Sequence, residues 1–405
     1  MTEPLANRQV RFVARLGAAM GAGNYPVTLV RQMLERASGA YGVRNDFIVL
    51  PNYVQVIGPA TAPGTVVNAA NLKSELRFDQ MFPLAGLVSD AMAGRVSPEQ
   101  GEGRLDRILE MPGRYPSWVT VLGYGVQSAG LALVLEPTPL NLVVATVLGF
   151  MVGFFCAVGQ RIGLVSHLVP AISAFAVSAI CIAGARHLGY DHVSLRALIP
   201  PLAMFLPGAA ITLAVVELTA RDVISGSSRL IAGFMQIAQL AFGILIATQL
   251  LGADGSQLSP EALNKIGPWA PWVGVAVYTL GVMLFLAPPL SFLPWVGGIA
   301  YVAFAAQFLG GLVVGSYASG FCGGVVLTVA ALAVSRRPSA PPAITLILPG
   351  FWLLVPGSMG LIGVTELFGA DGDSALPATL ISMISVSLGL QAGLVIWQLV
   401  RRRAT

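Results

Sequence analysis

The chain is poor in charged residues, and this shortage limits what kind of protein it can be. Only 10% of its 405 residues are Asp, Glu, Lys or Arg, 55% are hydrophobic, and the mean hydropathy is +0.76. An ordinary soluble domain has about 25% charged residues, so the composition excludes a soluble globule and indicates a protein of the lipid bilayer. The net charge is only +4 and no basic run alternates with aromatic residues, so no nucleic-acid partner is predicted.

Cysteine and histidine are scarce as well. Cys156, Cys181 and Cys322 lie far apart in apolar segments, without a Cys-x-x-Cys pair or a histidine at ligand spacing. Neither a disulfide framework nor a metal site follows from them. The three histidines all come after residue 117, which excludes a Ser-His-Asp triad in the polar region before it, and that region has no phosphate-binding loop. We therefore predict no enzyme activity, no metal and no cofactor.

Most acidic residues lie in the first part of the chain, which predicts a polar N-terminal domain over 1–117. Arg8, Arg11 and Arg15 interrupt any apolar signal core, so we expect this domain to stay in the cytoplasm. The pattern predicts a small α+β fold, with a helix pair over 7–40, one or two strands within 47–59 and 65–67, and helices over 78–93 and 98–109.

Ten apolar segments follow, and each has about the 20 residues that a helix needs to cross a bilayer. We predict a membrane all-α domain made of two five-helix repeats, over 118–251 and 269–400. The segments are 118–135, 140–158, 164–184, 197–219 and 230–251, then 269–286, 290–308, 312–334, 343–367 and 378–400.

The fourth segment of each repeat carries the same pattern at an offset of 149 residues. Pro200, Pro207, Gly208, Glu217 and Leu218 recur as Pro349, Pro356, Gly357, Glu366 and Leu367. Because five spans is an odd number, the second repeat enters the membrane from the opposite side, which gives the inverted repeat of several secondary transporters. An alternative makes the fourth and ninth segments re-entrant, so that each half spans four times and the repeats are parallel.

Arginines between the segments indicate the topology, since short cytoplasmic loops collect lysine and arginine. The loops that lie inside when the N-terminus is cytoplasmic carry most of these arginines, and the tail adds Arg401, Arg402 and Arg403. We expect both termini in the cytoplasm and the long connection 252–268 outside.

The matched Pro-Gly pairs predict broken membrane helices. Proline removes a backbone donor, and glycine lets a ligand approach the backbone. The N–H groups and positive dipole end of the half-helix after each break suit a carboxylate, whereas a purely structural kink is the alternative. The candidate substrate-binding residues are Pro207, Gly208, Thr212, Pro356, Gly357 and Ser358.

Three titratable residues are candidates for proton coupling or gating. Glu217 and Glu366 lie near opposite membrane faces if each helix resumes after its break, and an acid within a bilayer is a functional candidate. Histidine is the side chain that most readily changes charge near physiological pH, so His167 could join a relay with Glu217. The alternative for each glutamate is a helix-end acid that reaches into the membrane interface.

Longer stretches of the chain carry a family resemblance. RFVARLGAAMGAGNYPVTLVRQMLERASGAYGV, RLDRILEMPGRYPSW, FLPGAAITLAVVELTARDVISGSSRL and LLVPGSMGLIGVTEL resemble the threonine/serine exporter family, over nearly the whole chain. The resemblance implies a protein of the bacterial inner membrane with a cytoplasmic N-terminal domain. It also implies proton-coupled export, an antiport, of small hydroxylated amino acids such as threonine and serine, with protons and the bilayer as further partners.

One stretch departs from the family pattern. Asn24-Tyr25-Pro26 stands where many relatives have an acid and a threonine, so no catalytic residue is carried over. The alternative function is a membrane-embedded enzyme or receptor whose N-terminal domain carries the activity. The sequence leaves the oligomeric state open, a homo-oligomer included.

Overall fold

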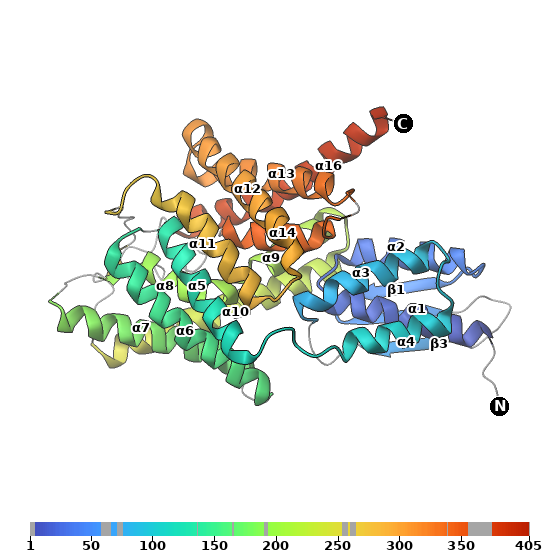
Figure 1. Cartoon of the computed structure of the whole chain (residues 1–405), viewed down its shortest axis with the longest axis horizontal. Coiled ribbons are helices and arrows are strands. Elements are labelled where there is room, and N and C mark those ends of the chain that lie inside the picture. Colours follow the sequence, from blue (N-terminus) through green and yellow to red (C-terminus); the bar gives the residue numbers. More distant parts are fainter. Residues whose placement is uncertain are drawn as a thin grey trace. The chain divides into compact units, whose positions relative to one another are not determined.

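The computed structural model describes residues 5–57, 66–70, 76–135, 137–163, 166–189, 193–252, 258–259, 265–337, 339–354 and 375–404. The chain divides into two compact units (Figure 1). The N-terminal unit comprises Met1–Arg114 together with Val216–Arg229, and the membrane unit comprises Tyr115–Val215 and Leu230–Thr405. A short hairpin from the middle of the chain therefore belongs to the N-terminal unit.

The N-terminal unit is an α+β structure. Its elements are α1 (Leu5–Ala22), α2 (Val27–Ala40), β1 (Asp46–Leu50), β2 (Tyr53–Ile57), β3 (Val66–Ala70), α3 (Phe78–Met92) and α4 (Pro98–Leu109). The strands form one antiparallel sheet in the order β1-β2-β3. The prediction of one or two strands is wrong, because Leu50 pairs with Tyr53 and the intervening Pro51 and Asn52 turn one apolar stretch into a hairpin.

Helices α1 and α4 are held together by a row of ion pairs and by a close contact. The pairs join residues 91 positions apart, and they are Arg8–Glu99, Arg11–Glu102 and Arg15–Asp106. Exposed pairs of this kind contribute at most about 1 kcal/mol each, so they set the register of the two helices more than their stability. Between the helices, Gly101 leaves room for Phe12, whose Cζ would lie 2.4 Å from a Cβ at that position.

The membrane unit is built from helices. They are α5 (Ser117–Leu135), α6 (Pro139–Arg161), α7 (Val169–His187), α8 (Leu195–Leu202), α9 (Gly208–Thr219), α10 (Val223–Leu250), α11 (Ala270–Phe285), α12 (Leu293–Val314), α13 (Ser316–Val334), α14 (Ala343–Leu353) and α16 (Ala375–Ala404). The first residues of α10 and the last of α9 lie in the N-terminal unit. Two short strands, β4 (Val193–Ser194) and β5 (Leu258–Ser259), pair in parallel.

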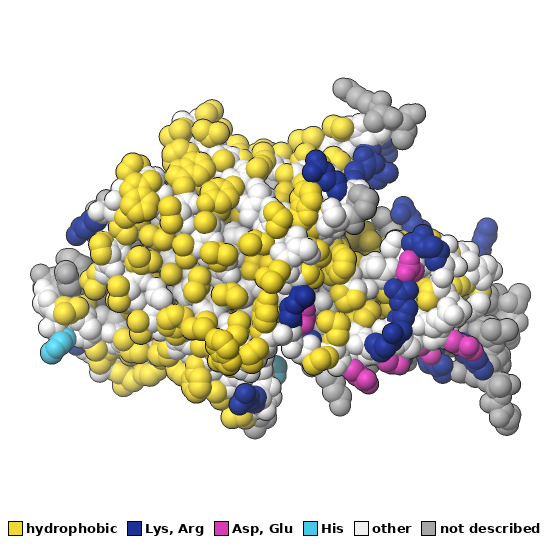
Figure 2. Space-filling model, viewed as in Figure 1, with side chains coloured by type: hydrophobic (Ala, Val, Ile, Leu, Met, Phe, Trp, Pro, Cys, Tyr) yellow, Lys and Arg dark blue, Asp and Glu magenta, His cyan; other side chains and the backbone are white. Residues whose placement is uncertain are grey.

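In the part of the chain that the structure describes, six helical segments are long and apolar enough to cross a membrane, and one bent helix pair raises the number to seven. Three shorter apolar helices, at Ala270–Phe285, Ala318–Val334 and Ala343–Leu353, lie where further spans are predicted. Hydrophobic side chains cover the visible face of this unit, whereas acidic and basic side chains gather on the N-terminal unit (Figure 2). A mostly helical, multi-pass membrane protein is confirmed, and the ten-span inverted repeat stays a prediction.

Helices α5 and α11 cross at four glycines. Gly123 and Gly130 of α5 and Gly274 and Gly281 of α11 have the same seven-residue spacing. A Cβ at Gly130 would lie 2.2 Å from the backbone nitrogen of Tyr278, and one at Gly281 would lie 2.1 Å from that of Gln127. Backbone therefore packs directly on backbone, as small residues allow between membrane helices.

The two halves also use corresponding helix contacts. In the first half α5 packs on α6 and α8, and in the second α11 packs on α12 and α14. Gly243 places α10 against α7 at Ala171 and Ala174, and Gly389 and Gly393 place α16 against α13. The same order of contacts in each half is what a duplicated helical unit requires.

Gly281→Ala should destabilise the membrane unit, because the new methyl group has no space against the backbone of α5. Overpacking of this kind costs about 1–3 kcal/mol. The measurement is thermal unfolding of the purified protein in detergent. Gly298→Ala on α12 is the matched control, since nothing lies within 4 Å of its Cβ position. Equal melting temperatures for both variants would show that the α5–α11 crossing is looser than described.

Candidate functional site at the helix break

A broken helix is the most unusual feature of the membrane unit. Helix α8 passes into a short 3₁₀ turn at Ala203–Phe205, and α9 then starts at Gly208. The two pieces, Leu198–Phe205 and Gly208–Thr219, are bent by 50°. The predicted break at Pro207 and Gly208 is therefore present in the first half, as a broken span or a re-entrant turn.

Local sequence explains the break. Pro207 has no N–H to continue the ladder and disfavours a helical conformation at the residue before it, and Leu206 is accordingly extended, with φ −71° and ψ 123°. The carbonyl of Pro207 accepts the N–H of Ile211 at 2.9 Å, which starts α9. The N–H groups of the first turn, from Gly208 onward, have no partner within the helix and carry its positive dipole end.

The carbonyl groups before the break are held by two tyrosines. Tyr124 of α5 donates its hydroxyl to the carbonyl of Pro201 at 2.9 Å, and both groups are buried. In the second half, Tyr278 of α11 donates to the carbonyl of Pro349 at 2.8 Å. Sequence analysis missed both tyrosines. A tyrosine in the middle of a membrane span is the signal that could have found them, since a buried hydroxyl needs a partner.

The break lies where the packing of the two halves meets. Leu206 belongs to the buried cluster that contains Tyr124, whereas Ala209 packs on the cluster formed by α11 to α14 and α16. Gly233 of α10 leaves room for Ile211 of α9, whose Cγ1 would lie 2.8 Å from a Cβ at Gly233, and Pro207 lies next to the same position. Pro207 and Gly208 are buried.

A hydroxyl pair lies one turn beyond the break. Ser387 of α16 donates to the hydroxyl oxygen of Thr212 at 3.2 Å, and the two residues are 1% and 6% exposed. Ser385 on the same helix has a buried hydroxyl without a hydrogen-bond partner among the described residues. The first break thus combines the N–H groups of a helix start with hydroxyls contributed by both halves of the chain.

The second break falls outside the described residues, and so do Pro356, Gly357, Ser358 and Glu366. Helix α14 ends at Leu353, just before that region, and Gln307 of α12 donates to the carbonyl of Leu354 at 3.3 Å. The helix that leads toward the second Pro-Gly pair therefore ends with a side chain holding its last carbonyl group.

Glu217 is completely buried in the N-terminal unit. Both of its carboxylate oxygens accept from Nε of Arg229 at 3.1 Å, and Oε1 also accepts the N–H of Val27 at 3.2 Å. Val27 is the first residue of α2, and its N-cap residue Pro26 makes no side-chain cap. The carboxylate of Glu217 takes the place of that cap and lies at the positive end of the α2 dipole.

The hairpin that carries Glu217 and Arg229 is well defined. Arg221 has a left-handed backbone with φ 63°. The backbone N–H of Arg221 donates to the carbonyl of Leu218, and the backbone N–H of Asp222 donates to the backbone carbonyl of Glu217. This is the Schellman arrangement that ends a helix. Since α9 is one helix of 12 residues from Gly208 to Thr219, it joins the break directly to the buried ion pair.

The remaining candidates lie elsewhere. His167 occupies a 3₁₀ turn, Ser166–Leu168, at the start of the candidate span Ser166–His187, and its side chain is exposed. Asn24 has a left-handed backbone with φ 57°. The next residue, Tyr25, is buried, and burial raises the pKa of Tyr25 to about 12. Among the described residues, no group of three His, Cys, Asp or Glu side chains could hold a metal ion.

Comparison with known proteins identifies the family. The model of the ThrE family, described as "Putative threonine/serine exporter", matches residues 11–251, which include the N-terminal unit, the break and the Glu217–Arg229 hairpin. The chain belongs to the threonine/serine exporter family. No solved structure matches it.

Curated relatives of this exporter-family chain are yeast membrane proteins. "Pheromone-regulated membrane protein 10" is 23% identical in Candida glabrata, over 96% of this chain and 52% of the relative. The protein of that name in Zygosaccharomyces rouxii is 24% identical, over 95% of this chain and 42% of the relative. The chain thus spans about half the length of these relatives or less. Family and relatives point to a membrane transport protein and not to an enzyme.

Tyr124→Phe and Tyr278→Phe should each destabilise the membrane unit by about 1–3 kcal/mol, because each leaves a buried carbonyl without its donor. The control is Tyr301→Phe, which removes a 2.8 Å bond to the carbonyl of Trp272 at an exposed place. Thermal unfolding in detergent measures all three. Equal melting temperatures for the three variants would contradict a special role for the two buried tyrosines.

Proposed function

We propose that this chain is a secondary active transporter that exports small hydroxylated amino acids, threonine and serine above all, in exchange for protons. The observation that carries the proposal is the buried break at Pro207 and Gly208, where the first N–H groups of α9, which have no acceptor within the helix, lie one turn from the Thr212–Ser387 hydroxyl pair. The family assignment supports an exporter, and the buried hydroxyl pair is compatible with a small hydroxylated substrate.

Each group of a small hydroxylated amino acid has a counterpart at the break. The substrate carboxylate accepts from the N–H groups at the start of α9, which a helix dipole favours. Its side-chain hydroxyl exchanges hydrogen bonds with Thr212 and Ser387. Gly208 has no side chain of its own, which lets a ligand approach the backbone at this position.

The second Pro-Gly pair is proposed to complete the site from the other half. Pro356, Gly357 and Ser358 repeat the first break at the same offset of 149 residues. An inverted repeat would bring both breaks to the same depth in the bilayer, and alternating access would rock the halves around them. The equal glycine spacing in α5 and α11 supports such a repeat, and in each half a tyrosine binds a carbonyl of the proline segment.

Glu217 is proposed as the gate residue that also responds to protons. A buried arginine without its carboxylate partner is strongly unfavourable, by about 3–5 kcal/mol. Protonation of Glu217 therefore favours a state in which Arg229 leaves its buried position, and α9 transmits that change to the break. Glu366, at the matching place in the second repeat, and His167 are the further candidates for proton coupling. The bacterial inner membrane, with both termini in the cytoplasm, is the proposed location.

Gly208→Leu should abolish transport, because a leucine side chain fills the space where the substrate carboxylate meets the backbone. The assay is counterflow of labelled threonine or serine into proteoliposomes, with and without a pH gradient. Gly298→Leu on the exposed side of α12 is the matched control, since its Cβ position is open. Normal threonine affinity in a folded Gly208→Leu variant would show that the break is a structural kink.

Glu217→Gln should lose export driven by a pH gradient and keep exchange of substrate for substrate, because exchange needs no net proton transfer. Gradient-driven rates are expected to fall at least about tenfold. Glu35→Gln is the control, since Glu35 is an exposed acid on α2. An unchanged gradient response in Glu217→Gln would remove Glu217 from the coupling mechanism and leave Glu366 and His167.

A further inference from the structure

Helix α4 of the N-terminal unit separates its charges onto two sides. Its acidic residues, Glu99, Glu102 and Asp106, all pair with arginines of α1. The other side carries Gln100, Arg104 and Arg107, four and three residues apart, which is the spacing of neighbours on a helix face. The acids of α4 are therefore occupied by α1, and the other face of α4 is basic.

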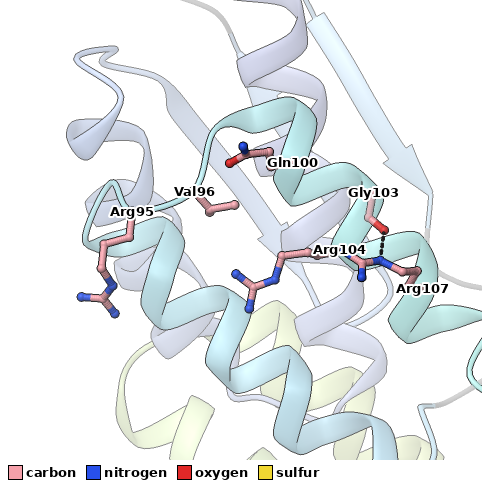
Figure 3. Close-up of a pocket in the computed structure, with 6 residues that line it drawn as sticks. All are labelled: Arg95, Val96, Gln100, Gly103, Arg104 and Arg107. Atoms are coloured by element: carbon pink, nitrogen blue, oxygen red, sulfur yellow. Dashed lines mark hydrogen bonds between the residues drawn. The ribbon is translucent and has the colours of Figure 1, made fainter.

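This basic side borders a hollow of about 400 Å³. Its lining is drawn in Figure 3 and consists of Arg95, Val96, Gln100, Gly103, Arg104 and Arg107. Arg95 comes from the connection between α3 and α4, and the other three polar side chains come from α4 itself. Three guanidinium groups from two segments thus border one surface depression.

One carboxylate organises two of these arginines. Asp90 accepts from Nη2 of Arg95 at 2.9 Å and from Nη1 of Arg104 at 2.8 Å. The hydrogen bonds from Arg104 and then Arg95 hold the pKa of Asp90 below its ordinary value, so it stays ionised. Three arginines and one aspartate leave a net charge of two positive charges at the hollow. No carboxylate of the described residues pairs with Arg107. Its Nε donates to the carbonyl of Gly103 at 3.2 Å.

Gly103 is the second observation that points to a ligand. A glycine weakens the interior of a helix, and the nearby Gly101 is explained by its close contact with Phe12. Packing does not explain the glycine at position 103, since nothing lies within 4 Å of its Cβ position. It lines the hollow between the arginines, where the absence of a side chain lets a ligand approach the backbone.

We propose that this hollow binds a phosphate-bearing anion. Arginine presents a planar fork of donors that matches phosphate oxygens in pairs, and Arg107 and Arg104 supply two such forks, with Gln100 as a neutral donor. The anion is either a soluble phosphate compound or the headgroup of an acidic phospholipid, because Arg107 precedes the first membrane helix, which begins at Ser117, by only ten residues. This site is independent of the transport proposal.

The soluble source is tested with inorganic pyrophosphate, titrated calorimetrically into the full-length protein in a neutral detergent. If the source is soluble, pyrophosphate binds, and Arg107→Gln and Arg104→Gln each weaken binding by about tenfold or more. Arg36→Gln is the matched control, because Arg36 is exposed on α2 outside the hollow. Gly103→Ala should raise the melting temperature and still weaken binding, a combination that a purely structural glycine would not give.

The lipid source is tested in nanodiscs of phosphatidylcholine alone or mixed with phosphatidylglycerol. Phenylglyoxal modification of Arg104 and Arg107, measured by mass spectrometry, should slow in the mixed discs while that of Arg36 is unchanged. Protection in the mixed discs without pyrophosphate binding assigns the site to a lipid headgroup. If pyrophosphate does not bind and neither arginine is protected, the hollow is a solvated surface and the proposal is wrong. These outcomes do not depend on whether the protein transports threonine.

Discussion

In a bilayer every backbone N–H and C=O group needs a partner within the protein or its ligand, and the membrane unit depends on how this is met around its prolines. Tyr124 and Tyr278 hold the carbonyls of Pro201 and Pro349, and Gln307 holds that of Leu354. The carbonyl side of these helices is thus supplied by the scaffold. The N–H groups at the start of α9 have no acceptor within the helix, which is why we propose the substrate site there.

The second consequence concerns how distant parts of the chain are joined. Gly130 and Gly281 bring the two halves into backbone contact, so the halves pack directly on each other. Helix α9 begins at the break and, about 14 Å further along at a rise of 1.5 Å per residue, carries Glu217 to Arg229 and the start of α2. The N-terminal unit of this chain therefore includes the hairpin formed by the end of α9 and the start of α10.

Features set by neighbouring residues could be predicted from the sequence, and features set by distant contacts could not. The break at Pro207 and Gly208 follows from local proline and glycine chemistry. The helical content follows from the length of the apolar segments. The partner of Glu217 is different, because the N–H of Val27 lies 190 residues away and no local pattern announces it. Likewise, apolar periodicity did not reveal that Pro51 and Asn52 divide one stretch into two strands, or that His167 sits in an exposed turn.

The central claim is that the N–H groups at the start of α9 hold the substrate. Amide hydrogen exchange of the full-length protein in detergent, followed over residues 203–212 with and without saturating threonine, tests this most directly. The account predicts slower exchange at Gly208, Ala209 and Ala210 when threonine is bound, and no change in the Gly208→Leu variant. Exchange at these three amides that stays the same while threonine binds and is transported would contradict the account.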